Sequence, residues 1–143
     1  MKMIKEPVPN TAFTISEKVF MIDLFSITNQ EVISLTFEEK NSPWKQGVWL
    51  SSDKGVEIQG QHLVSATLWY ETAPNPILIK CFTSSGLLMV YNVWDKGMGR
   101  ASQSRSSGML IEEIPFGRRY KCNDIGFETG FDKLVFKVVH LDT

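Results

Sequence analysis

The sequence predicts an all-β protein, an antiparallel β-sandwich of jelly-roll type with about 8–10 short strands. Two observations carry this prediction: apolar residues recur with a period of two, and turn residues interrupt the chain at short intervals. The clearest case is the segment 133–140, where Leu134, Phe136 and Val138 share one face and the two lysines lie on the other. No segment shows the longer period of an amphipathic helix.

The elements follow one another along the chain as strands of ordinary length. Residues 1–11 contain two prolines and an asparagine and are expected to form an extended arm. The remaining residues, 12–143, have the length of one domain and are expected to form a single one. The expected strands are 13–25, 31–38, 46–50, 56–59, 63–71, 77–83, 87–94, 109–114, 118–122 and 133–140.

Turn residues indicate how these strands connect. Ser52–Gly55 and Ser84–Gly86 are each expected to join the strands on either side of them as a hairpin. The prolines of 73–76 end a strand because proline has no N–H to donate to its neighbour. The polar stretches 95–108 and 123–130 show no apolar period and are expected to be loops.

The inward-facing positions of the best-defined strands give the expected core. These residues are Ile33, Leu35, Phe37, Leu88, Val90, Leu134, Phe136 and Val138. Cys81 and Cys122 lie in strand segments, where we expect buried thiols, with a cross-strand disulfide as the alternative.

Size and charge narrow the functional classes. The chain has 143 residues and a formal net charge of −1, so we expect no overall electrostatic attraction to nucleic acid or to an anionic membrane, with a local basic patch as the alternative. No apolar run approaches the length of a bilayer span, and the first residues lack the pattern of a secretory signal. These features predict a cytoplasmic protein.

Aromatic residues give the first candidate site. Four tryptophans in a small β-domain suit a ligand-binding face, because exposed rings stack against the C–H faces of sugars. Neighbours in a strand point to opposite faces, so one of Trp69 and Tyr70 must face outward. Trp44, Trp69 and Trp94 are therefore candidates for binding a carbohydrate-like or peptide partner, with core packing as the alternative.

Basic residues and an acidic loop give two further candidates. Arg100 and Arg118 belong to a basic stretch that would hold a phosphate or carboxylate if the long loop folds beside the 118–122 strand. The loop after this strand collects oxygen ligands suited to calcium, although its spacing is not that of an EF-hand. Its candidate ligands are Asn123, Asp124, Glu128 and Asp132. The alternative is a turn in which these side chains bind nearby backbone amides.

The C-terminal third of the chain carries a recognisable pattern. It contains Val90-Tyr91-Asn92-Val93-Trp94-Asp95-Lys96-Gly97, then Ser107-Gly108-Met109, then Gly117-Arg118-Arg119-Tyr120-Lys121-Cys122-Asn123-Asp124, and finally Phe131-Asp132-Lys133-Leu134-Val135-Phe136. This pattern resembles a family of small uncharacterised bacterial β-domains that end in an Asn-Asp, acidic loop and Phe-Asp-x-Leu-Val-Phe sequence. The resemblance implies a β-sandwich with a shared terminal hairpin and implies no activity.

Three functional hypotheses follow. The first is a non-enzymatic binding module with an aromatic-bearing face. The second is a calcium- or anion-binding domain that uses the loop 123–132, and the third is a small hydrolase with carboxylate chemistry. Catalysis is the least favoured, because His62 and His140 lie far apart in the sequence and no nucleophile motif surrounds either. Open sheet edges would also allow self-association.

Overall fold

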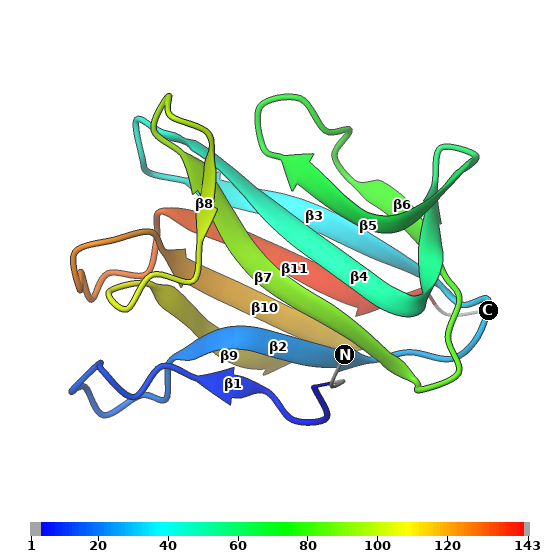
Figure 1. Cartoon of the computed structure of the whole chain (residues 1–143), viewed down its shortest axis with the longest axis horizontal. Coiled ribbons are helices and arrows are strands. Elements are labelled where there is room, and N and C mark those ends of the chain that lie inside the picture. The colour runs from blue at the N-terminus through cyan, green and yellow to red at the C-terminus, as the bar shows by residue number, and fades with distance from the viewer. Residues whose placement is uncertain (1–3, 142–143) are drawn as a thin grey trace.

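The computed structural model describes residues 4–141, and within that range it contains strands and no helix (Figure 1). The strands are β1 (Val8–Pro9), β2 (Phe20–Ser26), β3 (Val32–Lys40), β4 (Lys45–Ile58), β5 (Gln61–Trp69), β6 (Ile77–Cys81), β7 (Leu87–Asp95), β8 (Arg100–Ser102), β9 (Gly108–Ile114), β10 (Gly117–Asn123) and β11 (Leu134–His140). The all-β prediction is confirmed. Among the described residues no helix is long and apolar enough to cross a membrane.

The sheet closes on itself. Eight strands follow one another in the order β2-β9-β10-β11-β3-β6-β4-β7, and β7 then pairs with β2 through Asp23–Val90 to Ser26–Leu87. All pairings are antiparallel, so the fold is an eight-stranded antiparallel β-barrel, to which β1, β5 and β8 are added outside the ring.

The predicted β-sandwich is therefore wrong. A sandwich and a small barrel both need strands with one apolar face and one polar face, so alternation along the chain is the same in both. The two folds differ in whether the first and last strands of the sheet pair, and here β2 and β7 do. That long-range pairing leaves no mark in the local sequence pattern.

Both predicted hairpins are also wrong. Residues 45–58 form one strand, β4, with an irregularity between Ser51 and Val56. Asp53 at this bend accepts hydrogen bonds from the Thr83 hydroxyl (2.6 Å) and the Ser84 amide (3.0 Å), which ties the bend to the loop 82–86. That loop does not close a hairpin, because β6 pairs with β3 and β4 while β7 pairs with β2, β4 and β8.

The observed hairpin in this region joins β4 to β5. Its two-residue turn is Gln59-Gly60, and both residues have positive φ, 53° and 79°, as a turn of type I′ requires. The expected loop 95–108 contains a further short strand, β8, which pairs with β7.

The interior of the barrel is filled by side chains. All eight predicted core residues are buried, and Cys81 and Cys122 are buried free thiols rather than a disulfide. The largest fully buried side chains include Trp94, Tyr120, Phe131 and Phe136. The interior is thus a packed core, as is usual for small barrels.

A polar group is built into this core. The Tyr120 hydroxyl donates to Asp23 Oδ2 at 2.5 Å, and Arg118 Nη1 donates to the same oxygen at 2.8 Å. Asp23 is 1% exposed, so these two donors take the place of water around its carboxyl group. Burial raises the pKa of Tyr120 well above its ordinary value, and the neighbouring Asp23 carboxylate adds to the rise.

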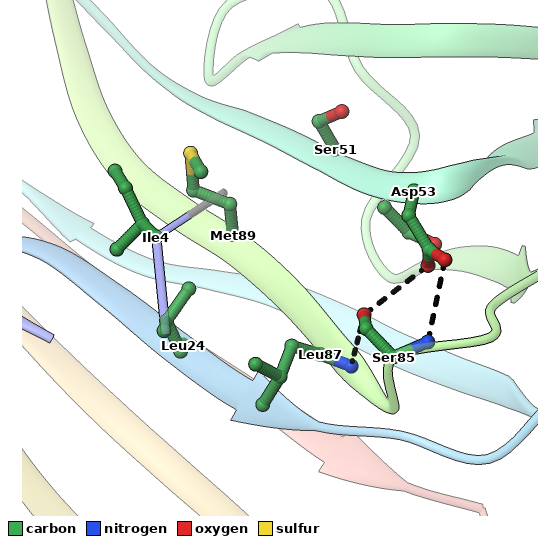
Figure 2. A pocket seen from close by; sticks show the side chains of 8 residues that line it. Ile4, Leu24, Ser51, Asp53, Ser85, Leu87 and Met89 are labelled. Atoms are coloured by element: carbon green, nitrogen blue, oxygen red, sulfur yellow. Dashed lines mark hydrogen bonds between the residues drawn. The ribbon is translucent and has the colours of Figure 1, made fainter. Parts of the chain in front are cut away.

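The two ends of the barrel differ. One end, on the left in Figure 1, carries the loops 41–44, 96–99, 103–107 and 124–133, and we call it the loop end. The other end carries the β9–β10 turn and the connections 27–31 and 82–86. Outside the closing seam, Ile4 lies over Leu24 of β2 and Met89 of β7, at an apolar pocket of about 140 Å³ (Figure 2).

Candidate functional site

The outward side of strands β5, β4, β7 and β8 carries a group of aromatic and polar side chains. β4 pairs with β5 on one edge and with β7 on the other, and β7 pairs with β8. We call this surface the aromatic face and define it by Trp49, Thr67, Trp69, Tyr91 and Arg100. The interior neighbours along these strands, such as Val48, Leu50, Leu68 and Val90, are buried, so alternation places the aromatic face outward.

Two of its rings stack on each other. Trp49 and Tyr91 are direct register partners on β4 and β7, and their ring centroids lie 4.6 Å apart with an angle of 17° between the planes. Both side chains are half-buried. Cross-strand aromatic pairs of this kind hold their rings in a fixed orientation, in which the two inner ring faces cover each other and the outer faces and edges are left for a ligand.

Trp69 adds a third ring beside this pair. It lies opposite Gly47 on β4, two positions before Trp49. A Cβ atom on Gly47 would lie 2.9 Å from Trp69 Cε3 and 2.6 Å from the carbonyl oxygen of Leu68. The absence of a side chain at Gly47 therefore lets the indole ring lie close to the backbone of β4.

Arg100 supplies the positive charge. Its Nη1 donates to Thr67 Oγ1 at 2.8 Å, so the side chain of Arg100 reaches from β8 toward β5 over the outer side of β7 and β4. Burial raises the pKa of the Tyr91 phenol, and the nearby Arg100 cation and Ser102 partly oppose this rise. Arg100 thus lies close to both the aromatic pair and Thr67.

The structure brings together two of the five predicted ligand-binding residues, Trp69 and Arg100. Trp94 is 2% exposed and belongs to the interior. Trp44 lies at the loop end, with Lys96 Nζ 5.3 Å from its ring centroid. Arg118 lies toward the opposite end, where it pairs with Asp23 and Glu113.

The sequence analysis missed Trp49 and Tyr91 as members of this site. Alternation on β4 gave a usable signal, because Trp49 lies between the apolar residues Val48 and Leu50 and must face the other way. The pairing of Trp49 with Tyr91 depends on strand register, and the local sequence carries no signal for it.

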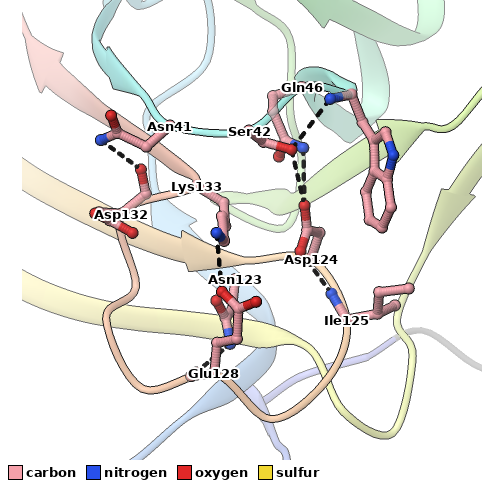
Figure 3. Close-up of polar contacts among 10 residues, drawn as sticks. Asn41, Ser42, Gln46, Asn123, Asp124, Ile125, Glu128, Asp132 and Lys133 are labelled. Atoms are coloured by element: carbon pink, nitrogen blue, oxygen red, sulfur yellow. Dashed lines mark hydrogen bonds and ion pairs between the residues drawn. The ribbon is translucent and has the colours of Figure 1, made fainter.

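The predicted calcium ligands lie at the loop end, where the side chains of Asn123, Asp124 and Glu128 have protein partners (Figure 3). Asp124 is 3% exposed and accepts hydrogen bonds from Gln46 Nε2 (3.1 Å), from the Ser42 hydroxyl (3.2 Å) and from the Ile125 amide (2.8 Å). These contacts join the loop 124–133 to the start of β4.

The remaining members of the predicted calcium set serve the same loop. Asn123 Nδ2 donates to the backbone carbonyl of Glu128, and the Glu128 carboxylate pairs with Lys133 Nζ at 2.9 Å. The backbone carbonyl of Asp132 accepts from Asn41 Nδ2 at 3.2 Å. Within residues 4–141 no three His, Cys, Asp or Glu side chains are grouped as metal ligands. The calcium site stays a prediction, which a thermal melt with calcium and with EDTA would test.

The two histidines lie in separate places. His140 stacks on Phe25 with ring centroids 4.7 Å apart, and its Nδ1 pairs with Glu31. His140 and Phe25 line a shallow cavity of about 280 Å³ at the end of the barrel opposite the loop end. His62 lies on β5 against Phe82, with ring centroids 5.2 Å apart.

No protein-family model, curated protein or solved structure matches this chain significantly. The resemblance of its C-terminal third to small bacterial β-domains therefore stays a prediction. The fold and the site together define a class of protein: an antiparallel β-barrel with a filled interior and an aromatic face on its outer wall.

Proposed function

We propose that this protein is a non-enzymatic binding module that recognises a carbohydrate on its aromatic face. The observation that carries the proposal is the row of three half-buried rings, Trp69, Trp49 and Tyr91, on the outer side of three neighbouring strands. They lie beside the hydroxyl of Thr67 and the guanidinium of Arg100. Large rings that are only partly covered by their own protein retain apolar area for a ligand.

A sugar suits this surface better than a peptide strand does. A pyranose ring has one apolar C–H face, which stacks on an indole, and a rim of hydroxyl groups, which need polar partners. The aromatic face offers both kinds of contact on one surface, with Thr67 and Arg100 at the edge of the rings. An extended peptide would need unpaired backbone groups, and β4 and β7 already pair on both sides through most of this region.

The outer wall is also the better place in this barrel for a ligand. The interior positions are occupied by large side chains that are less than 2% exposed, among them Leu50, Leu88 and Phe136. Opening such a core for a ligand would leave cavities, each of which lowers the stability of the fold. Binding on the outer wall requires no rearrangement of the barrel.

The test is a titration of the protein with a panel of oligosaccharides, followed by tryptophan fluorescence and calorimetry. For an oligosaccharide that binds, Trp49→Ala and Trp69→Ala should each weaken the affinity by about tenfold, or about 1.4 kcal/mol. Trp44→Ala is the matched control, because it removes an indole from the loop end and leaves the aromatic face intact.

Thermal melts of the three variants show whether each is folded before its affinity is compared. The proposal is contradicted if no oligosaccharide in the panel alters the fluorescence or produces heat. It is equally contradicted if a sugar binds and Trp44→Ala weakens the binding while Trp49→Ala and Trp69→Ala do not.

A further inference from the structure

Arg100 differs from the other arginines that lie on strands. Arg118 pairs with Asp23 and Glu113, and Arg119 pairs with Glu38 and Glu112. Arg100 is exposed, and in the part of the chain that the structure describes it has no carboxylate partner. The one hydrogen bond of its side chain among the described residues runs from Nη1 to Thr67 Oγ1.

The nearest carboxylate in register is turned away from Arg100. Asp95 is the β7 partner of Arg100, yet its Oδ1 accepts hydrogen bonds from the amides of Gly97 (2.7 Å) and Gly99 (3.2 Å). Both glycines have positive φ, 104° and 100°, which folds the turn around the Asp95 carboxylate. Asp95 thus holds the β7–β8 turn and leaves the guanidinium of Arg100 available.

Thr67 fixes the orientation of that guanidinium over the aromatic face. Because Nη1 is bound to Thr67, the nitrogen atoms Nε and Nη2 retain donors for a ligand. A planar guanidinium matches the two oxygens of a carboxylate, and part of the entropy of ordering its side chain is lost before the ligand arrives.

We infer that the ligand of the aromatic face is an acidic sugar, a uronate whose carboxylate binds Arg100 while its ring stacks on the indoles. This inference rests on the proposed function and specifies its substrate class. The stacking surface and the cation lie on the same outer wall, so one monosaccharide unit with a carboxylate at its ring can contact both. A neutral sugar would stack equally well, but its hydroxyl groups would not balance the charge of the guanidinium.

The experiment compares three uronate oligosaccharides, of galacturonate, mannuronate and glucuronate, each with its own methyl ester. The ester keeps the sugar ring and removes the charge. At least one acid should bind the wild-type protein ten or more times more tightly than its ester, and added sodium chloride should weaken only the binding of the acid. Arg100→Gln should abolish the difference, because the affinity for the acid should fall to that for its ester.

Arg105→Gln is the control, because Arg105 is an exposed arginine of the neighbouring loop and lies outside the aromatic face. Arg100→Lys keeps the charge without the two-pronged geometry and should lose most of the preference, which also covers the case in which Arg100→Gln fails to fold.

Two results overturn the inference. In the first, acid and ester bind with equal affinity and Trp49→Ala weakens the binding of both. This result would reject the uronate as the ligand and leave the proposed carbohydrate-binding function standing. Absence of binding to any sugar, neutral or acidic, would remove both. A preference for the acid that survives Arg100→Gln would also contradict the role given to this residue.

Discussion

Tyr120→Phe should destabilise the barrel more than the loss of a single hydroxyl usually does. The substitution keeps the ring, which stacks on Phe136, and removes only the oxygen that lies 2.5 Å from Asp23 Oδ2. Tyr120 is 0% exposed and Asp23 is 1% exposed. The buried carboxylate would then depend on Arg118 alone at this oxygen.

The structure sets the size of the effect. A hydrogen bond to a charged group contributes about 1.5–3 kcal/mol, and a buried charge that loses a donor keeps its desolvation cost. A chain of 143 residues has an unfolding entropy of about 0.3 kcal/mol per kelvin near its melting temperature. Tyr120→Phe should therefore lower the Tm by about 5–10 °C at neutral pH, as measured by circular dichroism or calorimetry.

The matched control is Tyr91→Phe, which removes a half-buried hydroxyl near Ser102 and Arg100 on the outer wall. No buried carboxylate depends on that hydroxyl, so the expected loss is about 0.5–1.5 kcal/mol. A Tm for Tyr120→Phe that equals or exceeds that of Tyr91→Phe would refute the view that Asp23 is held by Tyr120.

Three further predictions concern stability. Gly117→Ala should lower the free energy of urea unfolding by about 1–3 kcal/mol, because the new Cβ would lie 2.0 Å from the Val138 carbonyl oxygen. Gly130→Ala is the control and should leave the stability almost unchanged. Equal losses in the two variants would contradict this prediction. Burial raises the pKa of the Cys81 thiol from 9.0 to about 12, so the native state keeps a proton that the unfolded chain loses. Stability should fall between pH 9 and 12, and less steeply in Cys81→Ala; parallel pH curves would count against this. The hydrogen bond from Thr83 lowers the pKa of Asp53 below 3.8. The ionised Asp53 carboxylate therefore contributes fully to the stability of the folded state above that pH, and this contribution is lost as the pH falls further. Asp53→Asn should show a weaker acid dependence in urea midpoints, and an unchanged dependence would exclude this role.

Local patterns were enough to predict an all-β protein and its core residues, but not the barrel in place of the predicted sandwich. Period-two spacing identified the inward residues of β3, β7 and β11 correctly, because that spacing is imposed by one buried face in any half-buried strand. The barrel was not predictable in the same way. Its closure depends on the pairing of β2 with β7, and its bent β4 depends on Asp53 contacting a loop some thirty residues away in the chain.

The candidate site was half predictable for the same reason. Trp69 and Arg100 were identified from residue type and local context. Trp94 was misplaced on a ligand face, although Leu88 and Val90 were expected to face inward and alternation along β7 puts Trp94 on the same side. Trp49 and Tyr91 meet across the register of β4 with β7, so they become a stacked pair only once the strands are paired.

The most direct measurement on the proposed aromatic face uses the four indole N–H signals in a nitrogen–proton correlation spectrum, assigned by single substitution. Titration with a bound oligosaccharide should shift the signals of Trp49 and Trp69 and leave those of Trp44 and Trp94 in place. Shifts confined to Trp44, or no shift at any indole during saturable binding, would show that the outer wall of β4 and β5 is not where this protein recognises its ligand.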